Sequence, residues 1–156
     1  MQSKLRKLED LDVRFNDYET GPERYVRATW EMHIHRHYVL RENLSEQFIQ
    51  RFNQINCSLG ISVITINLGV HWEDYRWSKT LNAAIGESGY PVWIWFYGID
   101  ALRDSAYAGW LRTRLTVRRI ENLRVVFVVE TLDDFRAVFC DNREPFYQST
   151  MLLQTD

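Results

Sequence analysis

Three of the four histidines occupy alternate positions in the pattern His-x-His-x-His, formed by His33, His35 and His37. Side chains at alternate positions of a strand point to the same face of a sheet. Imidazole is a common ligand of zinc and other borderline metals, so a strand here would offer several ligands to one ion. The same face also carries Arg27, Thr29 and Glu31, and the alternative is a polar strand face that contacts solvent.

The fourth histidine, His71, follows the next predicted strand. If these two strands are parallel neighbours, His37 and His71 both lie at the carboxyl edge of the sheet, where open α/β sheets bind ligands. The metal hypothesis therefore takes His35, His37, His71 and Glu73 as ligands of zinc or another divalent cation. In it, Glu73 or Asp74 serves as the fourth ligand or as a general base.

Motifs for other chemistry are absent from the sequence. It contains no GxGxxG, GxxxxGK[ST] or GxSxG segment. Asp100 and Thr131 follow predicted strands and are best explained as helix caps. Cys57 and Cys140 flank apolar segments, which predicts buried, reduced thiols. We therefore predict no catalytic residue and no cofactor outside the metal hypothesis.

The composition is that of a soluble globular chain. The 156 residues are 46% hydrophobic and 26% charged, with a net charge of −2. One domain over 1–156 is expected, with 1–11 and 142–156 as candidate peripheral segments. The charge balance argues against nucleic-acid binding. No apolar run approaches the length of a membrane span or a signal-peptide core, which predicts a cytoplasmic protein that contacts no membrane.

Hydrophobic periodicity predicts strands that alternate with helices. The segment 24–39 alternates between apolar and polar residues, which indicates a half-buried strand, and 12–16 could pair with it through the Gly21-Pro22 turn. The order β-β-α-β-α-β-α-β-α predicts an α/β domain with a mixed, mostly parallel sheet of four to five strands and four helices. The further strands expected are 61–67, 91–99 and 123–130, and the helices are 45–55, 73–85, 100–115 and 131–140.

This order resembles that of the sulfate-transporter/anti-sigma-antagonist (STAS) domain and its SpoIIAA-like relatives. The segment Leu123–Val138, LRVVFVVETLDDFRAV, looks like the last strand and following helix of that family. The resemblance implies a regulatory domain whose partners approach the loop and helix start after the middle strand. The matching positions are His71, Trp72, Glu73, Asp74 and Tyr75. No hydroxyl residue stands there and Ser78 is expected inside the helix, so we expect no phosphoserine switch.

Aromatic residues make up 14% of the chain, including six Trp. Several of them are difficult to bury in a single core, and aromatic residues near a surface are frequent interface anchors. We therefore predict a small bacterial-type α/β protein that binds a protein partner without catalysing a reaction, and that forms a homodimer. The alternative is a metal-binding protein or metal-dependent enzyme that uses His33, His35 and His37 with His71.

Overall fold

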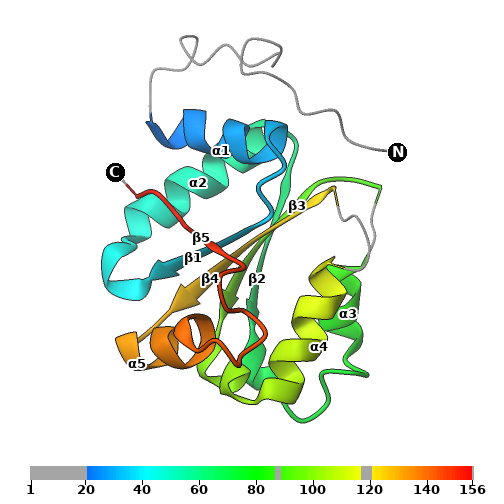
Figure 1. Ribbon diagram of the computed structural model, residues 1–156. Coiled ribbons are helices and arrows are strands. Elements are labelled where there is room, and N and C mark those ends of the chain that lie inside the picture. Colours follow the sequence, from blue (N-terminus) through cyan, green and yellow to red (C-terminus); the bar gives the residue numbers. More distant parts are fainter. Residues whose placement is uncertain (1–20, 87–88, 117–120, 156) are drawn as a thin grey trace.

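Five parallel strands form the centre of the computed structural model, which describes residues 21–86, 89–116 and 121–155 (Figure 1). The sheet order is β2-β3-β4-β1-β5, so β2 and β5 are its edges. All pairings between neighbouring strands are parallel. The strands are β1 (Arg36–Leu40), β2 (Ser62–Asn67), β3 (Val92–Tyr97), β4 (Leu123–Val129) and β5 (Met151–Leu152).

The strands β3 and β4, two of the three inner strands of the described sheet, are covered on both faces, as their continuous apolar sequences predict. Every residue of β4 is buried, and so is every residue of β3 except Tyr97. Trp93 and Trp95 belong to the core on one face of the sheet, while Ile94 and Phe96 belong to the core on the other. The sheet is therefore the middle layer of a three-layer α/β sandwich.

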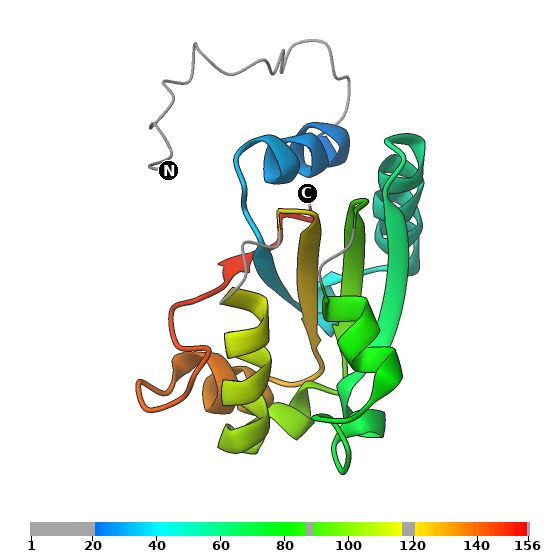
Figure 2. The same cartoon turned by 90° about the vertical axis from the view of Figure 1, so that its right-hand side faces the viewer.

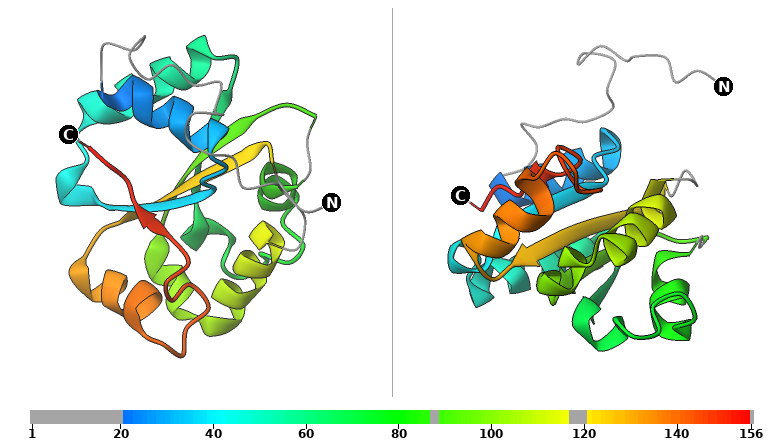
Figure 3. Two further views of the ribbon diagram at one scale, coloured as in Figure 1. Left: turned by 45° about the horizontal axis from the view of Figure 1, so that its top comes forward. Right: turned by 60° about the horizontal axis from the view of Figure 1, so that its bottom comes forward.

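The helices divide unequally between the two faces (Figure 3). Residues of α1 (Gly21–Glu31) and α2 (Glu46–Ser58) pack on the face that contains Trp93 and Trp95. The opposite face is covered by α3 (Lys79–Ile85), α4 (Ser105–Thr116), α5 (Leu132–Phe135) and the π-helical turn Arg136–Cys140 that continues α5. No helix in the described part of the chain is long and apolar enough to cross a bilayer.

The prediction of a strand over 24–39 is wrong for its first part, because Gly21–Glu31 is helical. Gly21-Pro22 begins this helix, where the fixed φ of proline is favourable, and does not form a turn. The buried residues Val26 and Thr29 recur at helical spacing, which the apparent alternation concealed. Strand β1 begins only at Arg36, and the described sheet contains no antiparallel hairpin. The predicted partner strand 12–16 lies outside the described residues.

Arg124, a buried arginine on β4, fixes the end of α1 against the sheet. Its guanidinium donates to the main-chain oxygens of Thr29 and Trp30, and it lies 4.3 Å from the centre of the Trp30 ring. It also donates to the oxygens of Glu121 and Leu123. The carbonyl groups that end α1 are therefore satisfied by a cation, which also complements the helix dipole.

Two smaller predictions need correction. Asp100 lies in a 3-10 turn (Ile99–Arg103), and Asp104 is the residue whose carboxylate accepts from the first amides of α4. Both Cys57 and Cys140 are exposed. The segment after 141 forms turns followed by β5, and it buries Phe146 and Leu153. Thr131, in contrast, caps α5 as predicted by accepting from the Asp134 amide.

Candidate functional site

The chain leaves the carboxyl ends of β1 and β4 toward opposite faces of the sheet. β1 leads to α2 on one face, whereas β4 leads to α5 on the other. In open α/β sheets such a switch point forms a crevice in which ligands bind. Next to it, Val39, Leu44, Phe48 and Leu153 help to line a groove of about 610 Å³.

Charges at this switch point oppose the binding of a phosphate. The Ser45 hydroxyl already accepts from the Phe48 amide at the start of α2. Arg41 donates to a carboxylate oxygen of Glu46 at 3.2 Å, so its charge is already paired. Burial raises the pKa of Tyr97; nearby Arg41 lowers it, and Glu46 and Glu130 raise it. The carboxylates therefore repel an anion at a helix end that would otherwise attract one.

The histidines are not brought together with His71. β4 and β3 separate β1 from β2, so the expected neighbouring strands are not neighbours. His35 precedes β1 at the amino edge of the sheet, and His37 is the second residue of β1, whereas His71 follows β2 at the carboxyl edge. Within the described ranges, no three His, Cys, Asp or Glu side chains are grouped so that they could hold a metal ion. The metal hypothesis stays a prediction without geometric support from these residues.

Each histidine of the His-x-His-x-His pattern has a different environment. His33 is exposed in a left-handed turn with φ 55°. The His35 ring lies 3.1 Å from a guanidinium nitrogen of Arg124, and burial, together with that charge, lowers its pKa. His37 is fully buried between Tyr25 and Trp93. Burial, with a smaller contribution from Arg124, lowers the pKa of His37 to about 4. The lowered pKa values favour the neutral form of both imidazoles, which lie near Arg124.

The loop after β2 is held against α4 by buried Tyr107 and half-buried Tyr75. It begins with a 3-10 turn (Leu68–His71), and the Tyr107 hydroxyl of α4 donates to the Leu68 oxygen at 2.9 Å. The Tyr75 ring stacks on Tyr107 with ring centres 4.3 Å apart and also packs against Trp110. Residues 70–77 are named the Trp loop from here on. Contacts with α4 hold the chain just before this loop, at Leu68, and within it, at Tyr75.

Side-chain hydrogen bonds fix the rest of the Trp loop. The Trp72 indole N–H donates to Asp104 at 2.9 Å, and this bond is the main cause of the lowered pKa of that carboxyl group. His71 and Ser78 share a hydrogen bond of 2.9 Å. The Asn82 amide group donates to the main-chain oxygens of Tyr75 and Ser78. The loop is therefore fixed by hydrogen bonds to the neighbouring residues Ser78, Asn82 and Asp104.

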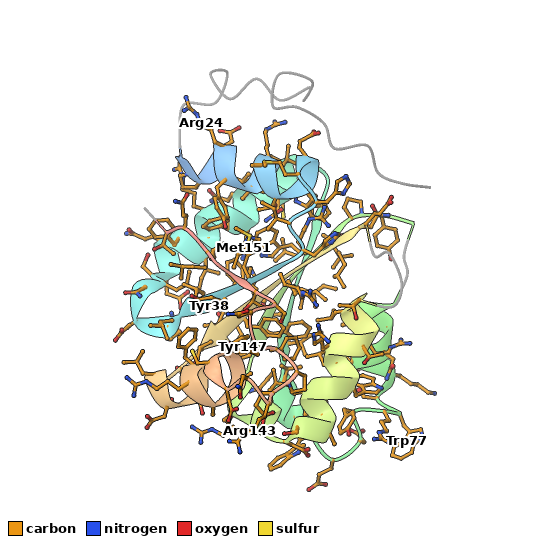
Figure 4. All side chains as sticks on the ribbon, in the orientation of Figure 1. Arg24, Tyr38, Trp77, Arg143, Tyr147 and Met151 are labelled. Atoms are coloured by element: carbon orange, nitrogen blue, oxygen red, sulfur yellow. The ribbon has the colours of Figure 1, made fainter. Side chains whose placement is uncertain are left out.

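Despite this order, the Trp loop presents large apolar side chains to solvent. Val70 is 74% exposed, Trp72 50% and Trp77 78%. Figure 4 shows the Trp77 side chain pointing away from the body of the molecule. The residues predicted from the family resemblance divide into two groups. His71 and Tyr75 are half-buried and hold the loop, whereas Trp72, Glu73 and Asp74 are exposed.

Sequence reasoning missed Val70 and Trp77 as surface residues. The helix predicted over 73–85 would place Trp77 on one apolar face with Leu81 and Ala84, but turns occupy 72–77 and α3 begins at Lys79. Ser78, which was expected inside that helix, is its N-cap. A serine whose hydroxyl can accept from the main-chain amide three residues later is a typical first residue before a helix. Ser78 could therefore have placed Trp77 outside the helix.

The chain was compared with family models, with curated proteins and with solved structures, and no match was found in any of the three.

Proposed function

We propose that this protein is a non-enzymatic α/β domain that binds a protein partner through the Trp loop. The observation that carries the proposal is the exposure of Trp72 and Trp77 on a loop whose backbone is fixed by Tyr107, Ser78 and Asn82. The expectation of a STAS- or SpoIIAA-like regulatory domain remains part of this proposal, because its docking positions fall in the same loop.

An ordered loop favours binding because little conformational entropy is lost when a partner covers it. Tryptophan is also the residue type most enriched among interface residues that dominate binding energy. Burying an exposed tryptophan removes a large apolar area from water at about 25 cal/mol per Å². We expect the partner to offer an apolar pocket for Trp77.

Carboxylates beside the tryptophans indicate the polar part of this partner. Glu73 and Asp74 are exposed in the Trp loop, and Asp104 accepts from Trp72 beside them. A basic rim around the apolar pocket would complement these carboxylates and increase the association rate. Arg76 and Lys79, which flank Trp77 in the sequence, are also exposed, so the surface carries charges of both signs.

Affinity capture from the cells that produce the protein tests the proposal. We expect Trp72→Ala and Trp77→Ala to lose at least about tenfold in the capture of one defined protein, which corresponds to about 1.4 kcal/mol. Tyr90→Ala is the matched control, because Tyr90 is a 62% exposed aromatic residue outside the loop. A captured set that both Trp variants leave unchanged would contradict the proposal.

A further inference from the structure

The edge strand β2 lies in an uncharged part of the chain. From Phe52 to Val70 the sequence contains no Asp, Glu, Lys, Arg or His, although 26% of all residues are charged. Proteins usually protect an exposed edge with lysine, proline or a bulge, because unpaired main-chain groups invite another strand. Strand β2, with the sequence SVITIN, has no charged residue and no proline, and it pairs regularly with β3 over its whole length.

The main-chain groups on the outer side of β2 can be identified from its pairing. The Ser62 amide donates to the Pro91 oxygen on the β3 side at 3.1 Å. Because the direction of the peptide groups alternates along a strand, the N–H and C=O groups of Val63, Thr65 and Asn67 point away from β3. Among the described residues, no strand pairs with β2 on that side, which lies at one margin of the sheet in Figure 2.

The chain just before and just after this strand is also uncharged. The last two turns of α2, which leads into β2, expose Gln54, Cys57 and Ser58. At the other end of the strand, Val70 is exposed. An open strand edge within an uncharged segment fits a partner that pairs along the strand without needing complementary charges.

We propose that a second copy of this chain occupies the β2 edge and that two β2 strands pair antiparallel across a two-fold axis. With the axis at Thr65, each Thr65 lies opposite its counterpart, and Val63 lies opposite Asn67, so that all outward main-chain groups are paired. A two-fold axis places identical residues close together, which is unfavourable for a charged edge and favourable for this one. The two sheets then join into one continuous sheet.

Sedimentation velocity tests this inference by measuring the mass of the protein in solution. Protein concentrations from about 1 μM to about 500 μM cover dimers of weak to moderate affinity. We expect the wild-type chain to reach twice its mass of 18.7 kDa within this range. Thr65→Pro removes one outward N–H while it leaves the β2–β3 hydrogen bonds in place, since proline is tolerated on an edge strand. This variant should stay monomeric, as should Thr65→Lys, in which two like charges would face each other.

Two further samples complete the test. Thr113→Lys makes the same substitution at an exposed position of α4 and should dimerise like the wild type. A mixture of Thr65→Lys with Thr65→Glu should regain the dimer mass, because opposite charges then meet at the axis. If Thr65→Pro fails to fold by circular dichroism, the lysine and glutamate variants decide the matter. A wild-type chain that stays monomeric, or a dimer that Thr65→Lys does not weaken, would overturn the inference. The Trp loop proposal is untouched by either result, because its capture assay is separate.

Discussion

At the scale of single residues, the most consequential group is the buried cation of Arg124. Its guanidinium is stabilised by main-chain oxygens and by the Trp30 ring. Its charge is compatible with His35 and His37 only while those imidazoles are neutral. His35 and His37 therefore belong to the packing near this arginine, which the sequence alone does not reveal because Arg124 is remote in the chain.

This arrangement predicts that acid destabilises the fold. The pKa of His37 falls from 6.5 to about 4 on folding, so the unfolded chain binds the additional proton between these pH values. Stability is therefore retained above pH 6.5 and is lost as the pH falls toward 4, by about 3 kcal/mol from His37 alone. Urea unfolding at a series of pH values measures this loss.

The substitution His37→Phe keeps a ring between Tyr25 and Trp93 and removes the titrating group. We expect the variant to reduce the pH dependence of the unfolding free energy by about one proton between pH 6.5 and 4. His33→Asn is the control, because His33 is exposed and asparagine tolerates its positive φ. Identical pH profiles for His37→Phe and the wild-type protein would contradict this assignment.

At the scale of elements, the start of the Trp loop depends on a close approach between the ends of β2 and β3. Gly98 follows β3 with φ 69°, a left-handed conformation. A Cβ atom there would collide with the Asn67 side-chain oxygen and lie 2.8 Å from the Gly69 nitrogen. Asn67 in turn accepts from the Gly69 amide, which shapes the 3-10 turn before the loop.

We expect Gly98→Ala to lower the free energy of unfolding by at least about 2 kcal/mol, from backbone strain together with the collision. Gly60→Ala is a matched control, because Gly60 also has a left-handed φ of 79° but no atom lies within 4 Å of the place that its Cβ would take. Its cost should be only the conformational part, about 1 kcal/mol. Equal losses measured by chemical denaturation would show that the Asn67 contact does not matter.

The elements also show how far the sequence could predict this fold. The buried strands β3 and β4 and the Thr131 cap follow from local patterns, and they are confirmed. The helix α1 was missed because the spacing of apolar residues in this short segment fits the two-residue period of a strand as well as the 3.6-residue period of a helix. The position of β1 between β4 and β5 depends on contacts remote in sequence, and for this reason the neighbours of His37 could not be derived.

At the scale of the whole molecule, the two proposed association surfaces are the edge of β2 and the Trp loop that follows it in the chain. The β2 edge offers main-chain pairing to a second copy, and the Trp loop offers aromatic side chains to a different protein. Both follow directly from the position of β2 at the margin of the sheet, which leaves its edge and its following loop uncovered by other strands of the described chain. Self-association and partner binding are therefore expected to be separable by substitution.

Site-specific photo-crosslinking in the producing cells tests the central claim most directly. With p-benzoylphenylalanine in place of Trp77, illumination should join the protein to one defined partner, because only atoms in contact with that side chain react. The same group in place of Thr113, an exposed residue of α4, should give no such product. A single crosslinked partner at position 77 alone is the result we predict. The absence of any product there, or the same products at both positions, would contradict a docking role for the Trp loop.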